Sequence, residues 1–553
     1  MAAASATGDA GLKLRAALGR LLFTSPLYPL SLAGRKLSRL ELVPEDPWPG
    51  DVATANALFR GCYRFAGAEI NAPNQPPWHP QGASPAWLAE LHGFAWLRHF
   101  SAAGGDAARR QARALVGSWL SHHQQWDRAV WQPEVLARRL VSWFSHAGLL
   151  FDPVEPALQA ALLDGMARQG RHLARAIGHT PPGPGRITAA MGLIFSGLCL
   201  ADGKGRLARG LKHLEQELAA QVLPDGGHVG RNPSLHLAVL RDLVTLRGAL
   251  AQGQQEVPQA LQNAIDRMAP MLRFFRHGDG CLALFNGSSE EPDGAVDLTL
   301  ARAEAKGKAP ASAPHCHFER LAAKRTLALL DVGAPPPAAT GATAHAGLLS
   351  FELSLGRERL VVNCGAPENA AGPWARAMRA TAAHSTLVLA DHSSVALDAG
   401  GHLEGAAPRA SCSRNEADGS TWIEAEHDGY MARFGLRHRR RLYLDGSGDD
   451  IRGEDSLSGE TRHPVAFAIR FHLHPLVNAS LVQNGVAVLL KLPGGTGFRL
   501  RAQGGAVSLD ESIYLGDAGQ QRRAEQIVIS GLTEGQETTV KWAITRLTPA
   551  GGE

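Results

Sequence analysis

Hydrophobic residues in the first half of the chain recur at helical spacing. From about residue 51 to 276, apolar side chains return at i, i+3, i+4 and i+7, in segments that end at Gly, Pro or Asp. Segments of this kind cover residues 85–100, 106–123, 132–150, 156–177, 187–202 and 233–252. Their succession, with short connections, predicts stacked antiparallel helical hairpins in either a bundle or an α/α toroid. No exact repeat is present, which argues against a regular solenoid.

The pattern changes after about residue 277. Gly and Pro become more frequent, and short runs alternate in polarity or are rich in Val, Ile, Leu and Phe. Such runs cover residues 326–333, 347–355, 359–365, 385–390, 421–427, 440–445, 465–474, 486–492, 497–502, 526–531 and 539–545. They predict a large antiparallel β-sandwich. The proline-rich segment 334–347 is expected to be a surface loop of this second domain.

These patterns predict an α+β multidomain protein with helices first and sheets second. We expect a partly helical N-terminal segment at 1–50, a helical toroid domain at 51–300 and an antiparallel β-sandwich domain at 301–553. A chain of 553 residues is too long for one ordinary core, which supports this division.

Composition narrows the class of protein. The chain has 56 basic and 52 acidic residues, a net charge of +4, which argues against a generic nucleic-acid or membrane-surface protein. The six cysteines lie far apart without a CxxC pair, so neither structural zinc nor a dense disulfide framework is expected. No apolar stretch is long enough for a transmembrane helix. Asp9 and Arg20 interrupt the N-terminal apolar run, which favours an amphipathic first helix over a secretory signal.

The stretch PDGGHVGRNPSLHL, residues 224–237, concentrates polar groups between a turn and a helix. Its first four residues predict a turn, and Asn232 followed by Pro233 predicts a capped helix start. In a structural interpretation Asn232 caps, while His228 and Arg231 are solvated and His236 is the polar edge of a helix face. In a functional interpretation, this helix start beside Arg231 and the two histidines suits an anionic sugar.

A second polar constellation lies in the β region. Arg376, Arg379 and His384 precede the predicted strand at 385–390, which places His384 at a strand entrance. A lone histidine there is more often structural, but the two arginines favour an acidic ligand. Further polar groups follow at Asp391, His392 and Asp398, and then at His427, Asp428, Tyr430 and His438.

The ordered series of these segments resembles the heparinase II/III family of bacterial polysaccharide lyases. The β half carries RATAAHSTLVLAD and then HDGY and LRHRRRLYL, and the helical half carries LHGFAWLRHF, WQPEVLARRLVSWFSHA, GRITAAMGLIFSGLCLADG and LPDGGHVGRNPSLHL, followed by LALFNGSS. The resemblance covers most of residues 50 to 546. It implies an incomplete α/α toroid followed by an antiparallel β-sandwich, with the active site between them.

The resemblance also implies a chemistry, the cleavage of uronate-containing polysaccharides by β-elimination. The C5 proton beside a carboxylate is weakly acidic, so Arg, Asn or His must neutralise the carboxylate before a base removes that proton. An acid must then protonate the departing glycosidic oxygen. No pair of carboxylates is needed, unlike in a glycoside hydrolase.

Only one of the family's three functional positions matches well. The family's β-domain histidine corresponds to His384. Where the family has a Gly-Asn-type signature, this chain has PPGPGRITAA with Arg186 as the nearest polar residue, and where the family has Tyr before His, it has Leu235 before His236. The five tyrosines are Tyr28, Tyr63, Tyr430, Tyr443 and Tyr514. The toroid beyond its first hairpin therefore contains no tyrosine that could act as the acid or the base.

We expect histidines to replace the phenol, because an ordinary histidine pKa near 6.5 suits either acid or base. In this hypothesis His384 is the base and His228 or His236 the acid, while Arg231 and Asn232 hold the uronate carboxylate. Arg186 and Arg379 add contacts to the charged substrate, and Tyr430 remains an alternative group from the β domain. The expected partner is an acidic polysaccharide or oligosaccharide.

No cofactor is required for this chemistry, but the resemblance leaves room for a divalent metal, zinc or calcium, in the β domain. His384, Asp391 and His427 are chemically suitable ligands. The cluster His315, Cys316 and His317 lacks a matching partner pair, so a metal is not expected there.

Two other functions remain open. One is a glycan-binding or scaffold protein that kept the fold but lost turnover, which the missing tyrosine supports. The other is an α/α-toroid glycoside hydrolase, for which Asp225, Glu290, Glu291 and Asp293 are available without a spacing that selects a pair. The resemblance implies the periplasm or cell envelope, and the absence of a clear signal makes the cytoplasm the alternative.

Overall fold

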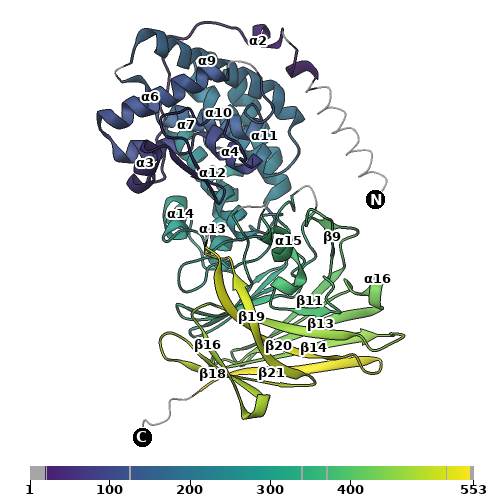
Figure 1. The fold of residues 1–553 in the computed structure, drawn as a ribbon. Coiled ribbons are helices and arrows are strands. Elements are labelled where there is room, and N and C mark those ends of the chain that lie inside the picture. The colour runs from purple at the N-terminus through teal and green to yellow at the C-terminus, as the bar shows by residue number, and fades with distance from the viewer. Residues whose placement is uncertain are drawn as a thin grey trace. The chain divides into compact units, whose positions relative to one another are not determined.

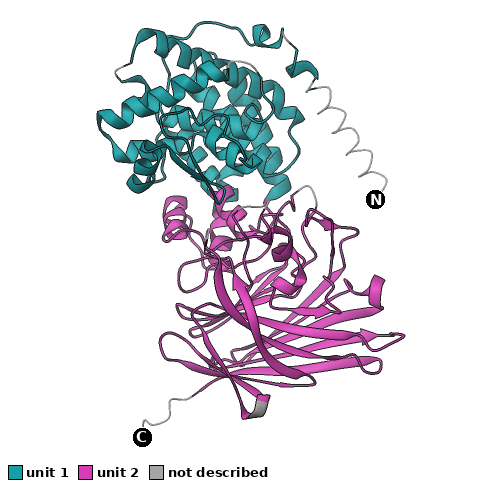
Figure 2. Ribbon diagram, viewed as in Figure 1, with its two compact units in different colours: residues 1–221, 241–265 teal, residues 222–240, 266–553 magenta. Residues whose placement is uncertain are grey.

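The structure is a computed structural model of the 553-residue chain. It describes residues 19, 21–25, 27–123, 126–152, 154–337, 340–368, 372–517 and 520–547, and in addition the side chain of Asn484 is not described. The expected first helix falls mainly on residues 1–18, outside the described residues. Two compact units are present, unit 1 with residues 1–221 and 241–265 and unit 2 with residues 222–240 and 266–553 (Figure 2).

Unit 1 is built almost entirely of helices (Figure 1). Its elements are α2 (Tyr28–Ser31), α3 (Val52–Phe59), β1 (Cys62–Phe65), β2 (Ala68–Asn71), α4 (Pro85–Gly93), α5 (Leu97–Ala103), α6 (Gly105–His122), α7 (Pro133–Ser145), α8 (Ala147–Phe151), α9 (Pro156–Ala176), η1 (Ile177–His179), α10 (Pro184–Cys199) and α11 (Lys204–Gln221). Helices α12 (Pro233–Gln252) and α13 (Gln259–Phe274) contribute residues to both units.

Local sequence explains where several of these helices begin. Proline occupies the first position of α4, α7, α9 and α10, where its fixed φ suits a helix and its missing N–H costs nothing. Helix α10 is apolar on nearly every face and packs against α7 and α11, so it forms the centre of unit 1. No described helix combines the length and apolarity that a membrane span requires.

Unit 2 continues with one helix, α14 (Ala295–Ala303), and then two large antiparallel sheets (Figure 1). The first sheet has the order β11 (Ala410–Ala417), β12 (Ser420–His427), β13 (Leu436–Leu444), β14 (Asp450–Gly459), β21 (Glu537–Arg546), β18 (Gly497–Gln503), β17 (Ala487–Lys491) and β16 (Asn478–Val482). The second has the order β19 (Ala506–Tyr514), β20 (Arg522–Leu532), β15 (Ala466–Leu473), β7 (Glu358–Val362), β6 (Phe351–Leu355), β5 (Thr326–Asp331), β4 (Phe318–Ala323) and β3 (Ser312–Ala313), with β8 (Leu387–Leu389) paired to β15.

Both sheets contribute to one apolar core. Leu330 and Phe351 of the second sheet, with Leu442 and Trp542 of the first, belong to the same buried cluster. The remaining elements of unit 2 are short: α15 (Trp374–Arg379), η2 (Thr381–Ala383), β9 (Ala396–Leu397), β10 (Leu403–Glu404), α16 (Met431–Phe434) and η3 (Gln483–Gly485). The predicted fold class, helices followed by an antiparallel β-sandwich, is confirmed.

Candidate functional site

The segment from Val222 to His228 forms a tight turn in unit 2. Leu223 N–H donates to Gly227 O at 2.8 Å and Gly226 N–H to Leu223 O at 2.9 Å. Gly226 has φ +87°, a conformation that favours glycine. The Asp225 carboxylate accepts from the backbone N–H groups of His315 and Cys316, at 2.8 and 2.7 Å. Asp225 therefore attaches this turn to the segment that precedes β4.

Arg231 is buried, with only 5% of its area exposed, so it is not the solvated residue of the structural interpretation. Its Nε donates to Cys316 O at 2.9 Å and its Nη2 to His317 O at 3.1 Å. The same guanidinium contacts Ala334 O and forms an ion pair with Asp331. All of these acceptors lie inside unit 2, so the guanidinium is fully engaged before any substrate is considered.

Asn232 caps α12 as predicted. Its Oδ1 accepts from Leu235 N–H at 2.9 Å, the bond expected of an N-cap side chain. Its Nδ2 donates to Asn286 O at 2.8 Å and to Thr343 Oγ1 at 3.1 Å. The cap is thereby also a link between the helix start and two loops of unit 2.

The two histidines of this stretch are buried and neutral. His228 Nδ1 accepts from Gly230 N–H at 3.0 Å, and burial lowers the pKa of His228 to about 3. His236 Nε2 lies 2.8 Å from Met268 O, so this nitrogen carries the proton, and burial lowers the pKa of His236 to about 4. Each side chain is 1% exposed. Neither ring is presented to solvent within unit 2.

His384 lies at the entrance to β8 and is 2% exposed. Its Nδ1 donates to Ala380 O at 2.9 Å, and its Nε2 is 3.1 Å from His345 Nδ1. Since Nδ1 of His384 carries the proton, Nε2 accepts from His345. Burial lowers the pKa of His384 to about 4 and that of His345 well below its usual range. Both nitrogens of His384 are thus occupied by groups of unit 2.

The structure connects His384 to the 224–237 stretch through two residues that the sequence did not indicate. His345 N–H donates to Asn286 Oδ1 at 3.3 Å, and Asn286 Nδ2 donates to Arg231 O at 3.1 Å. Asn286 also accepts from Asn232, as described above. Asn286 belongs to the LALFNGSS segment and His345 to the proline-rich loop at 334–347, but the sequence did not indicate that either contacts a site residue.

The other predicted site residues lie apart from this network. Arg186 is in unit 1, where it donates to Thr180 O and forms a 3.0 Å ion pair with Glu217. Arg379 is half-buried and lies 3.4 Å from Gly401 O. Tyr430 is buried and donates to Leu387 O at 2.8 Å, and burial raises its pKa. The Tyr430 hydroxyl therefore forms its hydrogen bond in the interior of the β-sandwich.

The three suggested metal ligands are not gathered into one group. Asp391 is exposed, whereas His427 is buried with its Nε2 3.3 Å from His438 Nδ1. Among the described residues, no three or more His, Cys, Asp or Glu side chains are arranged to hold a metal ion. His315, Cys316 and His317 are among these described residues and likewise do not form such a group. The donor set proposed from the sequence does not fit a metal in this conformation.

A groove of about 1300 Å³ lies in unit 2 beside α15 and α16. Ala380, whose carbonyl accepts from His384, lines the groove, so one hydrogen bond joins His384 to its wall. Arg376, Arg409 and Arg433 also line it, are exposed, and have no ion pair among the described residues. The carboxylates of Asp391, Glu404 and Asp428 line the same groove, and Asp428 Oδ1 accepts from the backbone N–H of Arg409 at 2.7 Å.

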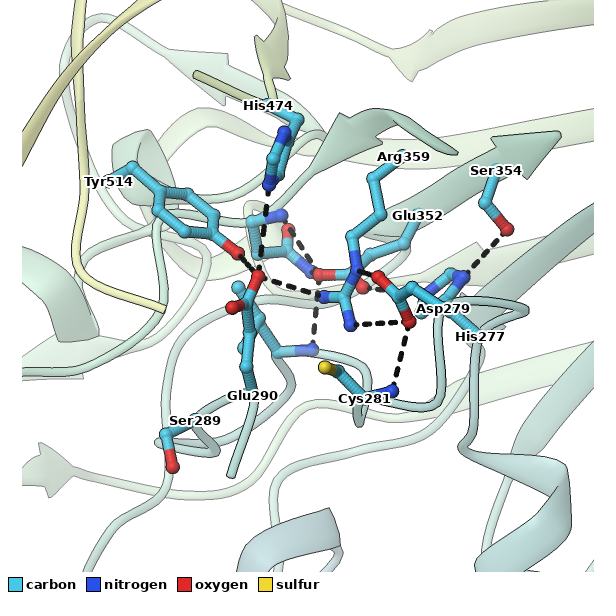
Figure 3. Close-up of polar contacts among 12 residues, drawn as sticks. His277, Asp279, Cys281, Ser289, Glu290, Glu352, Ser354, Arg359, His474 and Tyr514 are labelled. Atoms are coloured by element: carbon cyan, nitrogen blue, oxygen red, sulfur yellow. Dashed lines mark hydrogen bonds and ion pairs between the residues drawn. The ribbon is translucent and has the colours of Figure 1, made fainter. Parts of the chain in front are cut away.

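A further buried cluster surrounds Arg359 on β7 (Figure 3). Arg359 forms ion pairs with Asp279 at 2.7 Å and Glu290 at 3.7 Å. Tyr514 donates to Glu290, and His474 Nε2 lies 3.8 Å from the same carboxylate. These contacts attach segment 277–290 to β7 and β19. Glu290 is therefore held by Arg359 and Tyr514, and Asp279, which shares Arg359 with it, is itself ion-paired, so these described residues offer no free pair of carboxylates of the kind that a hydrolase uses.

Two family models match successive parts of the chain. Heparinase II/III N-terminus matches residues 121–301, and Heparinase II/III-like, C-terminal matches residues 305–543. FtsZ-localized protein C of Caulobacter vibrioides is 33% identical over 542 residues, which cover 95% of this chain and 93% of that protein. The chain belongs to the heparinase II/III-like family. The predicted family is therefore confirmed.

Solved structures of the heparinase II/III-like family share the fold. Heparinase III matches with a TM-score of 0.74 at 14% identity, covering 96% of this chain and 91% of that chain. A heparan sulfate lyase HepC mutant from Pedobacter heparinus matches with a TM-score of 0.65 at 16% identity, covering 98% of this chain and 89% of that chain. These likenesses support the toroid-plus-sandwich architecture.

Proposed function

We propose that this chain is an acidic-polysaccharide-binding protein in which the elimination chemistry of the lyase fold has been lost. The observation that carries the proposal is the state of His384. Both of its ring nitrogens are bonded within unit 2, to Ala380 O and to His345. A base must present a free lone pair to the substrate proton, and here that lone pair is already used.

The other groups that β-elimination needs are either already engaged in contacts within the protein or absent. The Arg231 guanidinium, our candidate for the substrate carboxylate, is engaged by Asp331 and three backbone carbonyls. Leu235 stands where the family has a tyrosine, and Tyr430 and Tyr514 are buried and bonded. His228 and His236 are neutral but enclosed. Turnover would need the 340–347 segment and its His345 to move away from His384.

Support for glycan binding comes from the groove beside α15. Its three exposed arginines form no ion pair among the described residues, and only Arg376 makes a guanidinium hydrogen bond there, to Asp398 O at 3.3 Å, so their charges are available to uronate carboxylates. The fold is also shared with proteins named heparinase III and heparan sulfate lyase. We therefore propose that the groove is where an acidic glycan binds.

One pair of measurements tests the proposal. The protein is incubated with a panel of uronate polysaccharides while ultraviolet absorbance is followed, and binding of each polymer is measured by affinity electrophoresis. We expect retarded migration with at least one acidic polymer, no effect of a neutral dextran, and no rise in absorbance. Absence of binding to every acidic polymer contradicts the proposal, and so does accumulation of an unsaturated product.

The second candidate is an active lyase, and a specific observation favours it. His384 occupies the family's β-domain position and is neutral, which is the form that a base requires. If absorbance rises with a polymer, His384→Gln should abolish that rise while polymer binding persists. An unchanged rate in this variant excludes His384 as the base.

The relative from Caulobacter vibrioides is named for localisation with FtsZ. We propose the same location for this chain, because the two proteins are similar over nearly their whole lengths. A fluorescent fusion should then colocalise with FtsZ in the native host. A uniform signal along the cell envelope would instead favour the location expected from the lyases.

A further inference from the structure

The outer face of the first sheet of unit 2 carries a groove of about 830 Å³, called the outer-face groove below. The strand register places its side chains in two rows that cross β11, β12, β13, β14, β21 and β18 (Figure 1). Intervening residues such as Ile423 and Leu442 belong to the apolar core, so both rows face away from the core. Because neighbouring strands lie about 4.8 Å apart, each row is about 24 Å long.

The first row contains two aromatic side chains on adjacent strands. In strand order it consists of Asn415, Trp422, Tyr443, Arg452, Ala543 and Arg501. The rings of Trp422 and Tyr443 have centroids 4.9 Å apart and planes tilted by 41°. Trp422 is 40% exposed and Tyr443 is partly exposed. The core lies on the opposite face of the sheet, so burial in the core does not explain this aromatic pair.

The second row is polar, and its charges alternate in sign. In strand order it consists of Ser413, Glu424, Arg441, Glu454, Lys541 and Gln503. Arg441 forms ion pairs with Glu424 at 2.5 Å and with Glu454 at 3.0 Å, and Lys541 lies 3.8 Å from Glu454. The four charges cancel, and none of the twelve residues in the two rows is buried. A ligand can therefore reach every one of these side chains.

The other cations of the outer-face groove are also paired, with one exception. Arg452 forms an ion pair with Asp450 at 2.6 Å, and Arg414 forms one with Glu319 at 2.8 Å. Arg501 is the one lining cation without an ion pair among the described residues. An anionic polymer would gain little here, because it would meet two carboxylates of the second row as well as the cations. The outer-face groove instead favours an uncharged ligand that both donates and accepts hydrogen bonds.

We propose that the outer-face groove binds a neutral oligosaccharide of β-linked pyranose units, laid across the strands along the two rows. The C–H faces of its rings pack on Trp422 and Tyr443. Its hydroxyl groups donate to the carboxylates of the second row and accept from the guanidinium and ammonium groups there, since an ion pair leaves further donors and acceptors on both partners. The small side chain of Ala543 leaves room in the first row for a further ring.

The linkage follows from the shape of the rows. A β-1,4-linked chain of glucose is extended and presents flat ring faces, which matches rows that run across six strands. An α-1,4-linked chain of the same sugar coils and cannot keep successive rings on one row. The outer-face groove shares no lining residue with the groove beside α15, and its ligand carries no charge, so this inference goes beyond the proposed function.

A peptide that adds a strand to the sheet is a poorer occupant. Five of the six strands, β12, β13, β14, β21 and β18, are hydrogen-bonded to a neighbouring strand on both sides. Their backbone N–H and C=O groups are therefore used within the sheet, whereas strand addition needs a free edge. The outer-face groove offers side chains to a ligand rather than backbone groups.

The test is calorimetric titration of the full-length protein with cellohexaose and, separately, with maltohexaose. We expect saturable binding of cellohexaose. Maltohexaose contains the same glucose units in α linkage and should bind at least about tenfold more weakly. Because cellohexaose is uncharged, its affinity should change less than about twofold between low and high salt.

Replacement of the exposed indole tests the location of the site. Trp422→Ala should lower the affinity for cellohexaose roughly tenfold or more, because the ring faces of the ligand lose their main packing surface. Trp126→Ala is the matched control, because it removes a partly exposed indole of unit 1. Its affinity should equal that of the wild type. Circular dichroism and the thermal midpoint of Trp422→Ala should stay close to the wild type, since Trp422 lies outside the core.

A second variant blocks the outer-face groove without removing a side chain that contacts the ligand. Ala543→Gln places a longer side chain between Arg452 and Arg501, on the face turned away from the core. We expect it to weaken cellohexaose binding roughly tenfold, since the added group occupies the space of one ring. This result does not depend on how well Trp422→Ala folds.

Absence of saturable cellohexaose binding to the wild type overturns the inference and leaves this face to a protein partner. Equal affinity of the wild type, Trp422→Ala and Ala543→Gln also overturns it, because the ligand then binds elsewhere. Equal affinity for maltohexaose overturns the linkage. Failure of the proposed function is distinguishable, because acidic polymers would then fail to bind while cellohexaose still binds. If Trp422→Ala loses binding of an acidic polymer, the assignment of a neutral ligand is wrong.

Discussion

At the scale of single residues, His384 illustrates how burial sets protonation. Folding lowers its pKa from about 6.5 to about 4, because the charged ring would lose water without gaining a carboxylate partner. The unfolded chain therefore binds the proton more readily than the folded one. Stability is highest above the unfolded pKa and falls as pH decreases from about 6.5 to about 4, by roughly 3 kcal/mol for this residue.

This linkage predicts the behaviour of His384→Gln. The variant is less stable than the wild type at about pH 7.5, because the bonds to Ala380 and His345 are altered. The difference should shrink by roughly 2 kcal/mol by about pH 5, since the variant no longer carries the proton-linked penalty. Denaturant titration at several pH values measures it.

His463→Gln is the control for this comparison, because His463 is exposed and forms no ion pair among the described residues. Its stability should follow the wild type in parallel over the same pH range. A constant difference between His384→Gln and the wild type at all pH values would show that His384 titrates normally in the folded protein.

At the scale of elements, β13 shows how strand alternation divides a basic run. Arg437, Arg439 and Arg441 point outward, as alternation predicts, whereas His438 and Arg440 point into the sandwich. Asp455 of β14 accepts from both buried side chains, at 2.7 and 2.8 Å. The buried Arg440 guanidinium is tolerated in the core because the Asp455 carboxylate forms an ion pair with it.

The turn before α12 supports an element-scale prediction. A Cβ on Gly226 would be strained at its positive φ and would overlap Arg267 O, whereas Gly294, at the start of α14, has φ +76° and open space around it. Gly294→Ala should cost about 1 kcal/mol of unfolding free energy, and Gly226→Ala roughly 2 to 4 kcal/mol. Denaturant titration compares them. Equal costs would show that the turn relaxes without loss of packing.

At the scale of the whole molecule, proposed glycan binding should depend on charge. Replacing both Arg409 and Arg433 by Ala should weaken binding of an acidic polymer about tenfold at low salt, because two guanidinium groups leave the groove. The loss should diminish as salt rises, since exposed charges are screened. Affinity electrophoresis at two salt concentrations measures both effects.

A double variant of matched charge separates the groove from net charge. Arg437 and Arg439 are on the outer face of β13 and pair with Glu426 and Glu537. Replacing both by Ala should leave polymer binding nearly unchanged. If the two double variants weaken binding equally, the polymer responds to the overall charge of the protein and not to the groove.

The sequence predicted the order of elements well because periodicity is a local property. Apolar spacing gave the helices of unit 1 and the strands of unit 2, and Asn232 beside Pro233 gave the start of α12. The roles assigned to His228, Arg231 and His384 remain predictions. The sequence pattern indicated that these side chains are polar. It did not indicate whether residues elsewhere in the chain would form hydrogen bonds with their nitrogen atoms.

The sequence by itself therefore determined the fold class, the family, and the absence of a toroid tyrosine beyond the first hairpin. Only the tertiary structure placed His345 against His384 and Asp331 against Arg231. The physical reason is sequence separation. These contacts join residues on different segments, so they depend on how elements pack and leave no periodic trace along the chain.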